Sequence, residues 1–216
     1  MLGFSSLITA SARPLAAATN RIVMPTFAKP VNACILTPSE TEGPYYFNAA
    51  LLRQDITEGR PGFPTKIGVQ VVRASTCAPV PNAIVDIWHC DAGGIYAGYS
   101  GQSGGADAQG DNFLRGIQVT DANGSATFLT LYPGWYQGRT QHIHFKVILN
   151  NQTLVTSQWF FSDTTTDEIY GIVEPYNARA ARGTRNANDM LYNPQLELTL
   201  TPDKGGIAGA FTIVVA

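Results

Sequence analysis

The chain has 216 residues, of which 44% are hydrophobic and 14% are charged, and its formal net charge is −2. This composition is typical of one globular domain with a sizeable core. A weakly charged chain without runs of Lys or Arg is poorly suited to bind nucleic acid or anionic membranes, and no apolar stretch reaches the roughly 18 residues of a membrane-spanning helix. We therefore expect neither nucleic acid nor a membrane as a partner.

Residues 1–33 are expected to be an N-terminal arm or the remnant of an export signal. They contain a short apolar stretch and the triplet Ala10-Ser11-Ala12, which resembles a signal-peptidase site, but no basic segment precedes the apolar part. We expect an extracellular or secreted protein, with a cytoplasmic protein as the alternative. Residues 34–216 are expected to form the folded domain.

Short strands follow an irregular stretch, residues 21–66, that is rich in Pro, Thr and Gly. Runs of β-branched and aromatic residues around turn signals predict four hairpins: 67–73 with 83–89, 115–120 with 125–131, 142–149 with 153–161, and 196–200 with 210–216. Only 166–183 has a weak helical tendency, which Pro175 interrupts. The pattern predicts an all-β fold, an antiparallel β-sandwich with a long irregular N-terminal arm and loop excursions.

The three cysteines, Cys34, Cys77 and Cys90, allow one disulfide and one free thiol. In the first predicted hairpin Cys77 lies near the turn and Cys90 near the far end, so these two cysteines are not expected to meet. Any disulfide would then involve Cys34. Three buried thiols are the alternative.

Two of the three histidines, His142 and His144, lie two residues apart in a predicted strand. Side chains at this spacing point to one face, with Cα atoms about 6.5 to 7 Å apart, so both imidazoles can bind one ion while Ile143 and Phe145 enter the apolar face. The pair alone is compatible with a zinc site, an iron site or an ordinary polar strand face. Further ligands are needed to choose among them.

Tyrosines are the candidate further ligands. Tyr136 precedes His142 by six residues with no Asp, Glu or Cys from there to His144, and Tyr96 follows a Gly-Gly turn. Phenolate is a hard anionic donor that stabilises Fe(III), whereas zinc prefers Cys or carboxylate beside His, and O2-activating Fe(II) prefers two His and one carboxylate. Two Tyr with two His would therefore favour ferric iron and an enzyme that activates its organic substrate.

Five stretches, taken in order, resemble the intradiol ring-cleavage dioxygenases, and most closely the protocatechuate 3,4-dioxygenase branch. They are Thr37–Tyr46, Val85–Tyr96, Phe113–Tyr136, Gly138–Phe145 and Ser157–Phe161. The resemblance covers roughly residues 34–162. It implies that residues 34–216 are an intradiol dioxygenase β-sandwich domain.

The resemblance also implies a set of site residues. A non-haem Fe(III) ion would be held by Tyr96, Tyr136, His142 and His144, with Tyr96 and His142 matching the equatorial pair and the other two the axial pair. Arg139 matches an arginine that stabilises negative charge on the substrate ring, Gln158 matches a glutamine beside the site, and Tyr136 matches a ligand that leaves the iron to act as a base.

The implied reaction uses a catechol-type substrate and O2, and gives a cis,cis-muconate-type dicarboxylic acid. The N-terminal arm lacks the helical periodicity of the catechol and hydroxyquinol branches, and the chain looks more like stand-alone exported members; its oligomeric state stays open. One alternative is a non-catalytic β-sandwich binding module. Another is a zinc-dependent hydrolase that uses His142, His144 and a carboxylate.

Overall fold

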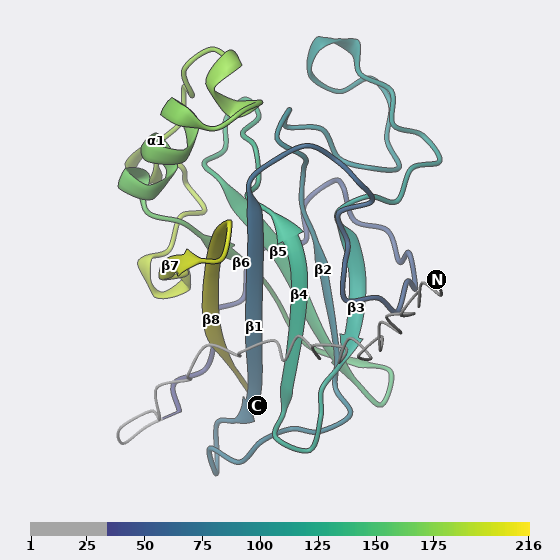
Figure 1. Ribbon diagram of the computed structural model, residues 1–216. Helices are drawn as coiled ribbons and strands as arrows, with labels where there is room; N and C mark the ends of the chain where they lie inside the picture. The colour runs from purple at the N-terminus through teal and green to yellow at the C-terminus, as the bar shows by residue number, and fades with distance from the viewer. Residues whose placement is uncertain (1–33) are drawn as a thin grey trace, which may run out of the picture.

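A computed structural model describes residues 34–216, so the expectations for residues 1–33 lie outside the described residues. The described chain forms two four-stranded sheets, with strand orders β4-β1-β8-β7 and β3-β2-β5-β6, one in front of the other in Figure 1. The strands are β1 (Pro64–Arg73), β2 (Ile84–Trp88), β3 (Arg115–Val119), β4 (Ser125–Leu131), β5 (His142–Leu149), β6 (Gln152–Phe160), β7 (Leu200–Asp203) and β8 (Gly206–Val215).

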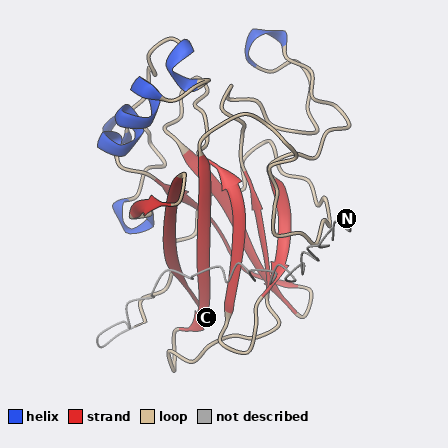
Figure 2. Ribbon diagram, in the orientation of Figure 1, coloured by secondary structure: helices blue, strands red, loops and turns tan. Residues whose placement is uncertain are grey.

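Helical segments lie outside the two strand layers (Figure 2). They are α1 (Asp163–Ile172) and the short 3-10 turns η1 (Ser103–Gly105), η2 (Tyr176–Ala178), η3 (Asn186–Asn188) and η4 (Pro194–Leu196). Helix α1 begins where the Ser162 side chain accepts a hydrogen bond from the Thr165 amide, and it ends before Pro175, as the sequence predicts. No helix in the described part of the chain is long and apolar enough to cross a membrane.

Each sheet buries one apolar face against the other, which confirms the predicted all-β sandwich. On β1 every second side chain from Ile67 to Val71 is fully buried, and on β5 Ile143, Phe145 and Val147 join the same core cluster. This period of two residues is the one that a half-buried strand requires. The residues that alternate with them on β5 therefore point away from the core.

Two of the four predicted hairpins are wrong. Strand β1 pairs with β4 and β8, whereas β2 pairs with β3 and β5, so the first two strands lie in different sheets. Strands β3 and β4 are likewise in different sheets, although the predicted turn at Asp121–Gly124 is present. An alternating pattern fixes which face of a strand is apolar but not its neighbour, and these turns pass from one sheet to the other.

The third predicted hairpin is confirmed, and the fourth is confirmed only in part. Strands β5 and β6 pair antiparallel, with His144 opposite Gln158, and β7 pairs antiparallel with β8. The last hairpin is displaced from the predicted one, because only Leu200 of the predicted strand 196–200 lies in β7, and residues 210–215 of β8 pair with β1. One pair departs from the antiparallel expectation, since β1 and β8 run parallel.

The structure forms a disulfide between Cys34 and Cys77, which confirms that the bridge involves Cys34, while Cys90 is free and buried. The hairpin of residues 67–73 with 83–89, which was expected to keep Cys77 and Cys90 apart, does not form. Residues 34–63, which are called the N-terminal arm from here on, contain no helix and no named strand, as expected of an irregular stretch.

Candidate metal centre

His142 and His144 lie on the outer face of their sheet, away from the core. Their side chains alternate along β5 with Ile143 and Phe145, which are fully buried in the core between the sheets. Even so, the two histidines are only 1% and 2% exposed, because loops and the N-terminal arm cover this face. The ring of Trp88, the cross-strand neighbour of His144, stacks on it with centroids 5.0 Å apart.

The structure brings the two predicted tyrosine ligands to the histidines. The hydroxyls of Tyr96 and Tyr136 lie 3.3 and 3.2 Å from Nε2 of His142. The ring centroids of the two tyrosines are 5.7 Å apart, and those of His142 and His144 are 4.8 Å apart. Four side chains from three separate stretches of the chain thus converge on one place.

Hydrogen bonding fixes which nitrogen of His142 faces the tyrosines. Its Nδ1 lies 2.7 Å from the carbonyl oxygen of Thr140, which can only accept, so Nδ1 carries the proton and Nε2 presents a lone pair. Burial, with the Arg139 cation nearby, lowers the pKa of His142 to about 3. Burial also holds the pKa of His144 well below its usual value, and its buried Nδ1 has no hydrogen-bond partner among residues 34–216. Both imidazoles are therefore neutral at pH 7, as metal ligation requires.

The two phenols fit a cation of high charge. Burial raises the pKa of Tyr136 to about 12, although the Arg139 cation works against this, and burial raises the pKa of Tyr96 well above its usual value. Both phenols are thus protonated in the absence of a cation, and a bound ion must displace their protons. Two phenolate oxygens and two neutral imidazoles form a donor set that suits a trivalent ion such as Fe(III).

In the described part of the chain, no carboxylate is placed to complete a zinc site with the two histidines. Among residues 34–216, no group of three or more His, Cys, Asp or Glu side chains is placed to hold a metal ion. The third histidine, His89, is buried elsewhere, where its Nε2 lies 2.7 Å from the Thr130 hydroxyl and its Nδ1 2.8 Å from the Cys90 carbonyl. The hydrolase alternative therefore lacks its third ligand in this part of the chain.

Arg139 and Gln158 lie beside the four candidate ligands. Nη2 of Arg139 donates to Oε1 of Gln158 (2.6 Å), Nε donates to Oδ2 of Asp189 (2.9 Å), and Nη1 lies 3.5 Å from Nε2 of His142. The Asp189 side chain is 1% exposed and also accepts from the Thr140 amide (2.8 Å). Sequence reasoning missed Asp189, because it lies 50 residues from Arg139 in a stretch without a recognisable motif.

The N-terminal arm covers the outer face of the sheet over the candidate centre. Gly43 has a φ of 73°, and a Cβ there would lie 3.2 Å from Cε1 of His144, so glycine permits both the turn and the close approach. The Tyr45 ring stacks on that of Tyr96, with centroids 4.6 Å apart, and the Tyr46 hydroxyl donates to Asp86 (3.1 Å). The arm thus closes the site with aromatic side chains.

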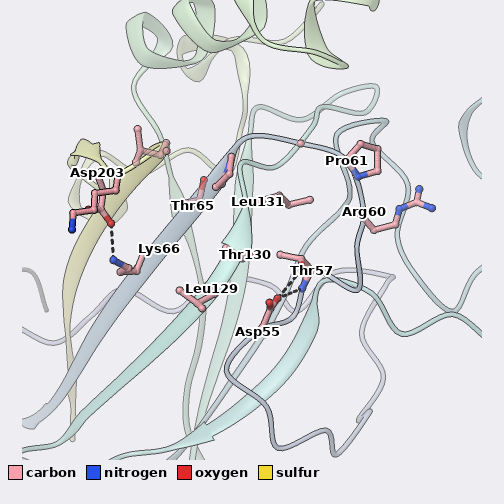
Figure 3. Close-up of a pocket in the computed structure, with 15 residues that line it drawn as sticks. Asp55, Thr57, Arg60, Pro61, Thr65, Lys66, Leu129, Thr130, Leu131 and Asp203 are labelled. Atoms are coloured by element: carbon pink, nitrogen blue, oxygen red, sulfur yellow. Dashed lines mark hydrogen bonds and ion pairs between the residues drawn. The ribbon is translucent and has the colours of Figure 1, made fainter. Parts of the chain in front are cut away.

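A separate cavity of about 600 Å³ lies on the other sheet (Figure 3). It is lined by residues of β1, β4 and the β7–β8 hairpin, and by the end of the arm, where Arg60 and Pro61 lie. Lys66 in its wall is paired with Asp203 (2.6 Å), and Arg60 forms an ion pair with Asp91. None of the predicted site residues lines this cavity, so it is distinct from the candidate metal centre.

Known proteins share this arrangement of sheets and motifs. A dioxygenase family profile matches residues 41–182. The solved structure of an intradiol ring-cleavage dioxygenase from Tetranychus urticae superimposes with a TM-score of 0.77 and 32% identity, covering 84% of this chain and 95% of that one.

Curated relatives match this chain over about half of their own length or less. A catechol 1,2-dioxygenase from Acinetobacter lwoffii is 28% identical over 57% of this chain and 45% of its own length. A protocatechuate 3,4-dioxygenase beta chain from Burkholderia cepacia is 38% identical over 39% of this chain and 40% of its own length. The chain thus spans about half the length of the curated relatives that it matches. The matched profile covers well over half of the sequence, and the fold agrees with it: the chain belongs to the intradiol ring-cleavage dioxygenase family.

Proposed function

We propose that this protein is a non-haem Fe(III)-dependent dioxygenase that cleaves a catechol-type ring between its two hydroxyl-bearing carbons. The observation that carries the proposal is the approach of two phenol hydroxyls, from Tyr96 and Tyr136, to the unprotonated Nε2 of His142. With His144 beside them, these side chains form the donor set that favours ferric iron over zinc or ferrous iron.

The proposed ligands are Tyr96, Tyr136, His142 and His144. Fe(III), when bound, would withdraw electron density from a chelated catecholate, so that the ring carbons react with O2. The catechol must lose both hydroxyl protons as it binds, and the Tyr136 oxygen is placed to accept one of them. Tyr136 suits this role because its side chain is not fully buried, whereas Tyr96 is 0% exposed and stacked under Tyr45.

Arg139 would stabilise negative charge that develops on the ring. Its guanidinium is fixed by Asp189 and Gln158, and the remaining nitrogen, Nη1, faces the place where the four candidate ligands meet. A fixed cation in a site that excludes water stabilises developing charge without having to reorient during the reaction. Gln158 is in turn held by the arm, because its Nε2 donates to the Thr41 carbonyl (3.0 Å).

The proposed reaction adds both atoms of O2 to the substrate. One molecule of a catechol and one of O2 give one muconic-type dicarboxylic acid, with cleavage of the bond between the hydroxyl-bearing carbons. Catechol-type compounds and O2 are therefore the proposed partners. We further propose that the protein works in an oxidising, extracellular compartment, which the Cys34–Cys77 disulfide supports.

Colour provides the test of the metal centre. Phenolate-to-Fe(III) charge transfer should give the iron-loaded protein a wine-red colour and a broad visible band, and Tyr96→Phe together with Tyr136→Phe should abolish it. O2 uptake with catechol should appear only in the coloured protein. Stoichiometric iron without colour, or colour that survives both substitutions, would contradict the proposal and leave the binding-module alternative.

A matched pair of histidine variants tests the ligand assignment. We expect His142→Ala to lose bound iron and O2 uptake, and His89→Ala to keep its iron, because His89 hydrogen-bonds to Thr130 and Cys90 rather than facing the tyrosines. Iron content by elemental analysis and O2 uptake by electrode give the two readouts. Equal loss of iron from both variants would show that the four ligands are assigned incorrectly.

A further inference from the structure

The two candidate tyrosine ligands lie in turns that follow strands of different sheets. Tyr96 follows β2, which belongs to the sheet of the histidine-bearing strand β5, whereas Tyr136 follows β4, which belongs to the opposite sheet. The spacing of His142 and His144 is set by one strand. No strand pairing sets the spacing of the tyrosines, so contacts between the two turns that carry them must do so.

Backbone contacts join the two turns closely. The Gly134 amide donates to the Asp91 carbonyl (3.0 Å), and the Cys90 thiol donates to the Gly134 carbonyl (3.4 Å). A Cβ at Gly134 would lie 2.4 Å from the Asp91 carbonyl oxygen, and one at Gly94 would lie 2.2 Å from that of Trp135, so only glycine fits at either position. The turns are therefore packed main chain against main chain.

Arg179 binds both turns at once. Its Nη1 donates to the Ala92 carbonyl (2.8 Å), its Nη2 donates to the Trp135 carbonyl (2.8 Å), and its guanidinium lies 4.4 Å from the centroid of the Trp135 ring. Ala92 precedes Tyr96 by four residues, and Trp135 directly precedes Tyr136. A planar guanidinium can hold two carbonyls at a fixed separation while it stacks on an aromatic ring, which a lysine ammonium cannot do.

We infer that Arg179 is a positioning residue that sets the separation of Tyr96 and Tyr136, and through it the affinity of the site for a trivalent ion. Without Arg179 the two carbonyls lose their shared donor, and the turns can move relative to each other. The phenol oxygens would then spend less time at the spacing that one ion requires. The inference rests on the proposed function, since it takes both tyrosines as ligands.

Binding of Ga(III), a redox-inactive trivalent ion, tests this role without any turnover. Ga(III) is titrated as a citrate complex into the iron-free protein, and tyrosine deprotonation is followed by ultraviolet difference absorbance. We expect Arg179→Lys and Arg179→Ala to weaken binding at least about tenfold, and Arg179→Lys to keep the unfolding free energy close to that of the wild type. With Fe(III), the visible charge-transfer band of both variants should shift or broaden.

Arg182→Ala is the control from the same segment. Arg182 forms ion pairs with Asp163 and Asp167 and donates to the Gln141 side chain (3.2 Å), but it binds no carbonyl of either tyrosine-bearing turn, so its loss should lower stability but change Ga(III) affinity less than about twofold. Should Arg179→Ala fail to fold, Arg179→Lys decides the matter. Wild-type affinity in Arg179→Lys, or equal weakening in Arg182→Ala, would overturn the positioning role. A wild-type protein that binds neither Ga(III) nor Fe(III) would instead refute the proposed function.

Discussion

The guanidinium of Arg139 is held by two side chains that come from distant parts of the chain. Asp189 lies in the loop after η3 and accepts from Nε, while Gln158 on β6 accepts from Nη2. Because Asp189 also accepts from the Thr140 amide, it ties the arginine to the residue whose carbonyl fixes the His142 ring. One buried carboxylate thus connects the proposed cation to a proposed ligand.

Asp189→Asn should slow turnover without removing the metal. The substitution keeps one oxygen that can accept from both Arg139 and Thr140, which share Oδ2 of Asp189, but it removes the charge that holds Arg139, so the guanidinium can leave its position beside the ring. We expect kcat to fall about tenfold or more, with the iron content and the resting visible band unchanged, in steady-state O2-uptake assays.

Asp203→Asn is the matched control, because Asp203 pairs with Lys66 on the other sheet and contacts none of the proposed site residues. Its kcat should stay within twofold of the wild-type value. A kcat for Asp189→Asn that matched this control would show that Arg139 does not depend on Asp189.

The N-terminal arm acts as a structural element although it has no regular secondary structure. The Cys34–Cys77 disulfide and hydrogen bonds of Thr37 to Val214 hold its beginning beside the ends of β1 and β8. Further on, the Glu40 amide donates to the Thr156 carbonyl (2.9 Å), and Glu42 forms an ion pair with Lys146. The arm is thereby fixed across the face that carries the candidate ligands.

Removal of the disulfide by Cys34→Ala together with Cys77→Ala should destabilise the protein by roughly 2 to 4 kcal/mol, because the unfolded chain regains the freedom of a loop that spans 43 residues. Urea unfolding measures this change. The Glu40 amide should also exchange its hydrogen faster in native-state exchange experiments, since the arm loses its anchor.

Reduction of the wild-type protein under mild conditions should reproduce both effects. If unfolding free energy and Glu40 exchange both stay at their oxidised values, the hydrogen bonds alone hold the arm in place.

At the scale of the whole molecule, the sandwich buries imidazole side chains, and burial disfavours their protonated, charged form. Burial lowers the pKa of His89 to about 4 and that of His142 to about 3, against an ordinary value of 6.5. The unfolded chain therefore takes up protons at a higher pH than the folded chain does. The stability that the neutral imidazoles contribute above pH 6.5 is lost as the pH falls from 6.5 toward their folded-state pKa values.

The raised pKa of Asp86, about 6, acts in the opposite direction, but the three buried histidines together should make the iron-free protein lose stability from pH 6.5 to pH 4. At about 1.4 kcal/mol per pKa unit, His89 alone accounts for a loss of roughly 3 kcal/mol. Urea unfolding at a series of pH values measures the slope, which His89→Gln should make shallower. An identical slope in the variant would mean that His89 does not titrate as its burial implies.

The sequence by itself determined the class of fold and the residues of the proposed centre. Runs of β-branched residues and the turn signals predicted a β-sandwich, and the resemblance to the intradiol dioxygenases implied Tyr96, Tyr136, Arg139, His142, His144 and Gln158, which the structure brings together. Local patterns suffice here because alternation records which face of a strand is apolar, and because the motif residues lie in short stretches of fixed spacing.

The tertiary structure decided which strands are neighbours and what holds the site. Alternation could not show that β1 and β2 belong to different sheets, since apolar faces that meet across a core look the same in sequence as faces on adjacent strands. It also could not indicate Arg179 or Asp189, whose partners are main-chain carbonyls or a guanidinium far along the chain. A carbonyl carries no side-chain signature, so only the folded chain shows which arginine it binds.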